Sequence, residues 1–284
     1  MLNALYITLL MFGTAGQSIA QKNYNAKMRG AGVFIFLVLS TLSASLFFLI
    51  TNGFSLTFSA KLLPYTLTYA ISGAFTGVCV FLAVCTGPLS LTSLITSYSL
   101  IIPTFYGLIF LGEKVGIPFW IGFALLAVSL FLINSPSAET KISFKWIVFV
   151  SLNFIGNGLC ALVQTKQQRD FNGELGNDMM ISALLVEAVL IFITAIIADR
   201  KSIGEGLKKG PHFMVMCGVS NALANFMLLL LIPRMLAAVL FPVISAGQII
   251  TSWVVSRFIY RERLSASQNI ALVLGTASIV LMNL

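Results

Sequence analysis

Long apolar runs recur along the whole chain and constrain its fold more than any other feature. Each is close to the length of about 20 residues that an α-helix needs to cross a hydrocarbon core of about 30 Å. None alternates with the period of two that marks the strands of an outer-membrane barrel. Because backbone groups in lipid must be paired within the protein, these runs predict an all-α integral membrane protein. We expect ten transmembrane helices, at 3–21, 30–50, 64–83, 89–111, 115–134, 144–164, 177–198, 211–231, 235–257 and 266–284.

The composition excludes most classes of water-soluble protein. Of the 284 residues, 58% are hydrophobic and only 9% are charged, too few charges to cover the surface of a soluble domain. The net charge is +8, but the basic residues fall in short clusters between apolar runs, as they do in membrane proteins. We therefore expect a multi-pass protein of the inner or plasma membrane, a monomer or homodimer. Its expected partners are membrane lipids and a small-molecule substrate, with no nucleic acid.

No motif indicates a cofactor, a metal site or hydrolysis of a nucleotide. The sequence has no Walker A loop and no spacing typical of a nucleophile with its base. The four cysteines lie inside apolar runs without a CxxC pair, which favours small buried residues over ligands or disulfides; they are Cys79, Cys85, Cys160 and Cys217. We expect no cofactor, no metal and no enzymatic activity.

A short signature occurs twice, about 149 residues apart. Glu113 follows the fourth apolar run in Gly-Glu-Lys, and Glu262 follows the ninth in Arg-Glu-Arg. Placing Glu113 on Glu262 also places Ser129 on Ser278. The two halves of the chain therefore share a pattern at their last two predicted helices.

A second match lies earlier in each half. The stretch from Gly13 to Gln21 parallels the stretch from Gly156 to Gln164. The repeating unit is then five helices, used in residues 1–134 and again in 144–284. Because five spans is an odd number, the second copy must be inverted in the membrane, an arrangement typical of secondary transporters.

These residues resemble a known family. Phe-Pro-Val at 241–243, Arg-Glu-Arg at 261–263 and the closing apolar helix are similar to the last two helices of EamA-like members of the drug/metabolite transporter superfamily. Gly-Glu at 112–113 and Gly-Asn-Gly at 156–158 resemble the signatures of the fourth and sixth helices. The resemblance implies a central cavity lined by helices 1–4 and 6–9, with helices 5 and 10 peripheral. Relatives carry amino acids, nucleotide sugars, cationic drugs and choline-like amines.

Glu187 is the acidic residue that lies farthest from the predicted membrane faces. It sits about nine residues from each end of the seventh run, or roughly 13 Å at about 1.5 Å per residue. A charge at this depth costs at least about 2.5–3.5 kcal/mol on insertion scales. Glu187 is therefore either a carboxylate that binds a proton or a cation in a cavity, or a protonated acid that is hydrogen-bonded to a neighbouring helix.

Polar side chains recur at helical spacing on several predicted helices. In lipid such stripes must face protein or water. Interhelical hydrogen bonds, worth about 0.6 kcal/mol each, could account for any one of them. Stripes on several helices together favour a shared hydrated cavity. With Glu187, the candidate substrate- or proton-binding residues are Gln17, Tyr98, Asn153, Asn157, Asn225 and Gln248.

The function predicted from these features is secondary active transport by alternating access. We expect a proton-coupled exporter or exchanger of a small polar or cationic metabolite. An alternative is a uniporter or exchanger of a neutral or anionic solute, which would be expected to carry Lys or Arg within a span; Arg257, near a helix end, is the nearest candidate. An intramembrane enzyme or scaffold is the competing class, and an enzyme would need paired acids, histidines or a nucleophile dyad in the spans.

The distribution of basic residues predicts the orientation in the membrane. Twelve lie in or beside the loops that follow odd-numbered helices, and five lie at the other loops. The positive-inside rule then puts both termini outside the cytoplasm. The twelve are Lys22, Lys27, Arg29, Lys141, Lys145, Arg200, Lys201, Lys208, Lys209, Arg257, Arg261 and Arg263.

Three further residues predict local features. Trp120 and Trp146 lie near the ends of their runs, where tryptophan commonly anchors a helix at the membrane interface. Pro103 lies within the fourth run and removes a backbone hydrogen bond, which predicts a kink.

Overall fold

Every regular element that the structure describes is a helix. The computed structural model describes residues 2–28, 31–86, 89–133, 143–259 and 266–282. The α-helices are α1 (Leu2–Met28), α2 (Val33–Thr51), α3 (Leu63–Thr86), α4 (Leu89–Tyr98), α5 (Ile101–Phe110), α6 (Ile117–Ile133), α7 (Phe144–Asp170), α8 (Gly176–Ala198), α9 (Ile203–Lys209), α10 (Pro211–Leu231), α11 (Ala237–Val254) and α12 (Ala266–Met282). Short 3-10 turns at Ala60–Leu62 and Arg200–Ser202 precede α3 and α9, and a π turn at Val255–Ile259 extends α11.

Five helical stretches are long and apolar enough to cross a membrane. They are Val33–Thr51, Ala60–Ala83, Phe144–Asp170, Gly176–Ala198 and Pro211–Leu231. Shorter apolar helices cover Ile95–Phe110, Ile117–Ser129 and Ala237–Thr251. The predicted class is confirmed to this extent: the protein is all-helical over the described residues and carries segments of spanning length.

The fourth predicted run is two helices, α4 and α5, and not one. Proline has no N–H and its ring clashes with the carbonyl four residues earlier, so Pro103 disfavours a continuous helix through Ser99. The chain turns there with tighter bonds, from Ile102 N–H to Ser99 C=O at 3.1 Å and from Leu100 N–H to Ser97 C=O at 3.4 Å. The predicted kink is thus a complete break between Tyr98 and Ile101.

Two helices extend beyond the ends predicted from hydropathy. The first run was expected to end at residue 21, yet α1 continues to Met28. Tyr24 is fully buried in this extension, and its hydroxyl donates to Gly32 C=O at 2.8 Å. In α7, Gln167 and Gln168 are buried beyond the predicted end at 164. Polar residues continue these helices because partners within the protein satisfy them.

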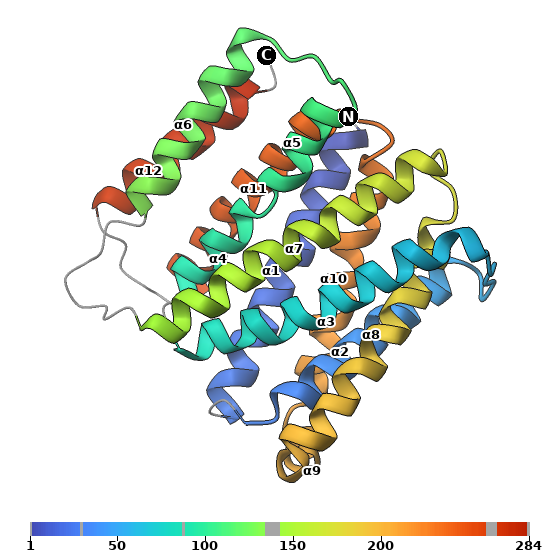
Figure 1. The fold of residues 1–284 in the computed structure, drawn as a ribbon. Coiled ribbons are helices and arrows are strands. Elements are labelled where there is room, and N and C mark those ends of the chain that lie inside the picture. Colours follow the sequence, from blue (N-terminus) through green and yellow to red (C-terminus); the bar gives the residue numbers. More distant parts are fainter. Residues whose placement is uncertain (1, 29–30, 87–88, 134–142, 260–265, 283–284) are drawn as a thin grey trace.

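The helices pack mainly in pairs from opposite halves of the chain. α1 packs along α10, α7 along α3, α2 along α8, and α6 along α12. Figure 1 shows α6 and α12 side by side at one edge of the molecule, with the other long helices crossing beside them. α1 begins and α12 ends at the same end of the molecule (Figure 1).

Small residues allow these close pairings. A Cβ added to Gly13 of α1 would lie 2.7 Å from Ser220 C=O of α10. A Cβ added to Gly122 of α6 would lie 2.8 Å from Ser278 C=O of α12. Without a strong hydrophobic force between helices in lipid, such close backbone contact is a main source of helix association.

Candidate functional site

The polar stripes of eight helices converge on one cavity of about 310 Å³. Its wall comes from α1, α2, α3, α4, α7, α8, α10 and α11. Among the side chains that the structure describes, none from α6 or α12 lines it. Its polar lining residues include Thr14, Gln17, Ser18, Gln21, Ser40, Thr41, Thr76, Thr92, Thr96, Ser97, Asn153, Asn157, Gln164, Glu187, Asn221, Asn225, Gln248 and Thr251.

Six of the seven residues predicted for the site line this cavity. They are Gln17, Asn153, Asn157, Glu187, Asn225 and Gln248. They come from α1, α7, α8, α10 and α11, helices that are distant in sequence. The structure therefore brings these candidates together around one space.

Tyr98 is the exception, and the structure does not place it in the cavity. It lines a separate void of about 10 Å³ with Phe123 of α6 and Pro242 of α11. Thr96 of the same helix faces the main cavity. Two residues further on, a side chain points about 200° around a helix of 3.6 residues per turn. Tyr98 therefore faces α6, away from the main cavity.

Glu187 projects from the middle of α8 into this cavity and is 9% exposed. Its carboxylate lies against Gly73 of α3, where an added Cβ would be 2.5 Å from Oε2. Within the described part of the chain, no hydrogen bond or ion pair to Glu187 is found. The sequence left two interpretations of Glu187 open. One of them, a protonated acid that is hydrogen-bonded to a neighbouring helix, requires a partner that the described residues do not provide.

Two asparagines of α7 are held in fixed orientations by α4. Asn153 Nδ2 donates to Thr96 Oγ1 at 2.6 Å, and Asn157 Nδ2 donates to Ser99 Oγ at 2.6 Å. Both hydroxyls give their own proton to a main-chain carbonyl, Thr96 to Thr92 at 2.8 Å and Ser99 to Thr96 at 2.6 Å. A hydroxyl has one proton, so each must accept from the amide, and the two amide nitrogens must face α4.

A similar chain of hydrogen bonds orients Gln164, about two turns beyond Asn157 in α7. Its Nε2 donates to Asn225 Oδ1 of α10 at 2.9 Å. Asn225 Nδ2 in turn donates to the Asn221 carbonyl at 3.0 Å. A main-chain carbonyl can only accept, so the amide of Asn225, and with it that of Gln164, is oriented without ambiguity.

Several cavity residues were missed by sequence reasoning. Tyr69, Gly73 and Thr76 of α3 all line the cavity. Thr92 and Ser97 of α4 also line it. A Ser or Thr hydroxyl within a helix can donate its hydrogen bond to the main-chain carbonyl three or four residues earlier. Such a residue needs no polar neighbour, so its presence in an apolar run does not indicate a cavity.

Trp146 was expected at the membrane interface, and this prediction is wrong. It is 4% exposed, and its Nε1 donates to Thr92 Oγ1 of α4 at 2.9 Å. A buried indole N–H needs an acceptor, and Thr92 supplies it near the start of α4. Trp120, by contrast, is 49% exposed on α6.

An apolar plug packs beside the cavity, where α10 ends and α11 begins. Phe241 and Ile244 line the cavity and pack in one cluster with the plug residues. The plug residues, each at most 1% exposed, are Leu231, Ile232, Ala237 and Leu240.

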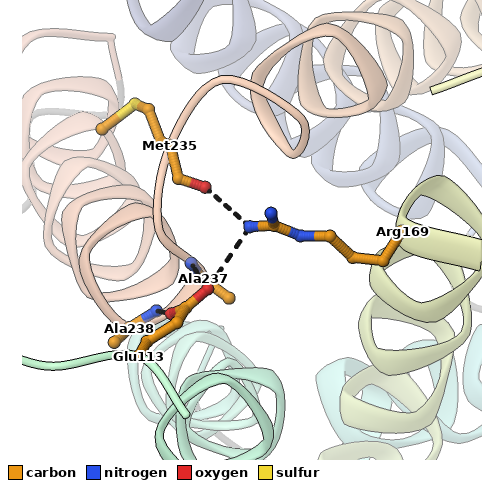
Figure 2. Close-up of polar contacts among 5 residues, drawn as sticks. All are labelled: Glu113, Arg169, Met235, Ala237 and Ala238. Atoms are coloured by element: carbon orange, nitrogen blue, oxygen red, sulfur yellow. Dashed lines mark hydrogen bonds and ion pairs between the residues drawn. The ribbon is translucent and has the colours of Figure 1, made fainter. Parts of the chain in front are cut away.

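A polar contact lies beyond this plug. Glu113, which follows α5, accepts the Ala237 and Ala238 N–H groups of α11 at 3.0 and 2.8 Å. Arg169 of α7 donates to Glu113 Oε1 at 3.3 Å and to Met235 C=O at 3.1 Å. Figure 2 shows Glu113 and Arg169 approaching each other from different helices, across the start of α11. Glu113 therefore binds the start of α11 and Arg169 and is not among the residues that line the cavity; Glu262 lies outside the described residues.

No group of three or more His, Cys, Asp or Glu that could hold a metal ion occurs within the described part of the chain. The site is therefore built from amides, hydroxyls and one carboxyl group. These groups can hydrogen-bond a solute and carry a single proton or negative charge.

The fold is shared with solved structures, whereas the sequence matches no known family. No protein family and no curated protein matches the sequence. Among 28 matching solved chains, one crystal structure of a protein superposes with a TM-score of 0.76 at 10% sequence identity. The match covers 98% of this chain and 95% of that chain. At this identity the likeness establishes that the two share a fold over their whole length.

Proposed function

We propose that this protein is a secondary active transporter that exchanges a small polar or cationic solute for a proton by alternating access. The observation that carries the proposal is the position of Glu187. It faces a polar cavity between the two halves of the chain and has no partner among the described residues. A carboxyl group held this way can release a proton when the cavity opens to one side and take one up on the other.

Ten spans in two inverted repeats of five helices, residues 1–134 and 144–284, are part of this proposal. The helix pairings support it. If α1, α2, α3, α4 with α5, and α6 correspond to α7, α8, α10, α11 and α12, then α1–α10 corresponds to α7–α3, and α2–α10 to α8–α3. The pairs α2–α8, α5–α11 and α6–α12 correspond to themselves. A two-fold relation between the halves predicts this set of pairings.

Matched close contacts support the same relation. Gly13 of α1 lies against α10, as Gly156 of α7 lies against α3. In α2, the Ser40 carbonyl lies against Gly218 of α10, and in α8, Glu187 lies against Gly73 of α3. Ser40 is thus the counterpart of Glu187, and the acid occurs in only one half.

The cavity wall favours this proposal over transport of an anion. No Lys, Arg or His is among the described residues that line it. A buried anionic solute would face Glu187 without a compensating positive charge, at a cost of several kcal/mol or more. The resemblance to the EamA-like family is in keeping with transport of a metabolite and stays a prediction from the sequence.

The proposal is tested with the purified protein in liposomes that contain a pH-sensitive dye. A panel of amines and neutral metabolites is added under an imposed pH gradient. Wild type should couple the movement of at least one solute to protons, whereas Glu187→Gln, which keeps the shape but cannot titrate, should lose the coupling. Glu174→Gln, an exposed glutamate outside the cavity, is the matched control. Equal coupling in wild type and Glu187→Gln would refute the role of Glu187.

A further inference from the structure

We infer that the solute carries a primary ammonium group, which binds between the Glu187 carboxylate and the amide oxygens of α7. This inference rests on the proposed transport function and names the chemistry of its substrate. The observation behind it is that the cavity-lining amide nitrogens of α7 bind other side chains of the protein, whereas the oxygens of these amides have no such partner among the described residues.

The amide nitrogens of α7 are all engaged by the protein. Asn153, Asn157 and Gln164 each donate from nitrogen to a side chain of α4 or α10. Their orientations are fixed, because the partner hydroxyls and Asn225 have no other way to satisfy their own bonds. The protein therefore already uses an N–H of each of these amides.

The carbonyl oxygens of the same three amides accept no hydrogen bond from the described residues. The clearest case is Asn153, which is 0% exposed and whose Oδ1 is buried without a partner. Leaving a buried acceptor unsatisfied costs about 1–3 kcal/mol. Asn157, one turn further on, is partly exposed and lines the cavity, so its free oxygen is open to a solute that donates hydrogen bonds.

Glu187 adds a further acceptor on the neighbouring α8. It lines the same cavity as Cys160 of α7 and Tyr69 of α3. The two helices therefore present a carboxylate and several carbonyl oxygens to the same space. A wall of acceptors with one negative charge matches a group with several N–H donors and one positive charge.

Three other classes of solute fit less well. A quaternary ammonium has the charge but no N–H, so it cannot donate a hydrogen bond to the amide oxygens of α7. A neutral alcohol has a donor but leaves the Glu187 charge without a partner. An anion meets the like charge of Glu187 and no basic side chain among the described lining residues. A primary ammonium satisfies both requirements.

The binding step is balanced when one proton leaves for each cation that binds. The protonated Glu187 carboxyl group loses its proton to the solution, and the ammonium then pairs with the carboxylate. The site is neutral before and after the exchange. No oxidant, reductant or second ion takes part.

The test is equilibrium binding to the purified protein in detergent, by isothermal titration at constant pH and ionic strength. The probes are ethanolamine, choline and ethylene glycol, because ethanolamine and choline differ only in three N-methyl groups. A cavity of about 310 Å³ has room for any of them. Ethanolamine should bind at least tenfold more tightly than choline and ethylene glycol, and Glu187→Gln should weaken ethanolamine binding at least tenfold while Glu174→Gln leaves it unchanged.

Each outcome decides the inference. Equal binding of ethanolamine and choline, tighter binding of choline, or no binding of ethanolamine overturns it. The comparison uses the unaltered protein, so it does not depend on whether Glu187→Gln folds. Failure here together with Glu187-dependent proton flux for another solute leaves the transport function standing. Ethanolamine binding without any proton-coupled flux supports the site and refutes the transport function.

Discussion

Glu113 and Arg169 join three helix ends beside the apolar plug. Glu113 follows α5, Arg169 is near the end of α7, and their side chains meet at 3.3 Å, at the first turn of α11. The two carboxylate oxygens also accept the first N–H groups of α11, which no residue of that helix can satisfy. The carboxylate is favoured there by the positive end of the helix dipole as well as by Arg169.

The first prediction concerns the stability that Glu113 contributes. Glu113→Ala leaves two N–H groups and a partly buried guanidinium without their acceptor, so the free energy of unfolding should fall by about 2–4 kcal/mol. Thermal unfolding in detergent measures the loss. Glu205→Ala is the control, because its pair with Lys209 is about half exposed and such pairs contribute about 0.3–0.5 kcal/mol. Equal losses for the two variants would mean that Glu113 is not a structural acceptor.

The second prediction concerns opening of the cavity at this end. Under alternating access, α7 and α11 must separate there, which breaks the Arg169–Glu113 contact. Arg169→Gln removes the ion pair but can still donate a hydrogen bond, so the Ala237 and Ala238 amides should exchange with deuterium severalfold faster. Hydrogen exchange read by mass spectrometry over the first turn of α11 measures this. Lys166→Gln, three residues earlier in an exposed pair with Asp170, should leave the rate unchanged; no change in Arg169→Gln would argue against a closing role.

Much of the site could be predicted because burial in lipid makes polar residues conspicuous. Glu187 stands out since a charge in the middle of an apolar run is costly. Asn153 and Asn157 stand out since they share one face of an apolar helix at a spacing of four. Their convergence in one cavity followed from the need of every stripe to face protein or water.

The remaining features depend on partners that the local sequence does not contain. Tyr98 has the right depth and polarity, but its direction depends on where α4 ends and on α6 beside it. Trp146 has the position of an interfacial anchor, but Thr92 of another helix gives its N–H a buried acceptor. The extension of α1 to Met28 depends on the burial of Tyr24 against α2 and the loop at Gly32. Such tertiary partners override hydropathy.

The third prediction concerns the contact between α3 and α7 behind the cavity wall. A Cβ added at Gly156 would overlap Thr76 Oγ1 of α3, and overpacking of this kind costs about 1–3 kcal/mol. Gly156→Ala should therefore unfold at a lower temperature than wild type. Gly204→Ala, with nothing within 4 Å of its added Cβ, is the control.

The double variant makes this prediction specific. Thr76→Ala removes the hydroxyl that an alanine at 156 would meet, so Gly156→Ala with Thr76→Ala should recover most of the lost stability. A double variant no more stable than Gly156→Ala alone would contradict the contact and point to a helix-wide effect.

The last prediction is that transport moves no net charge. Because the cavity contains one carboxyl group and no basic residue among its described lining residues, the site holds either one proton or one monovalent cation. Each cycle then exchanges one positive charge for another. With ethanolamine as the solute, the rate of proton movement in liposomes should respond to the pH gradient and not to a membrane potential set with potassium and valinomycin. Neutral amine also crosses lipid unaided, so the rate in protein-free vesicles is subtracted. A rate that changes with the potential at a fixed pH gradient would require a second charge in the cycle, and exchange at Glu187 alone would then be wrong.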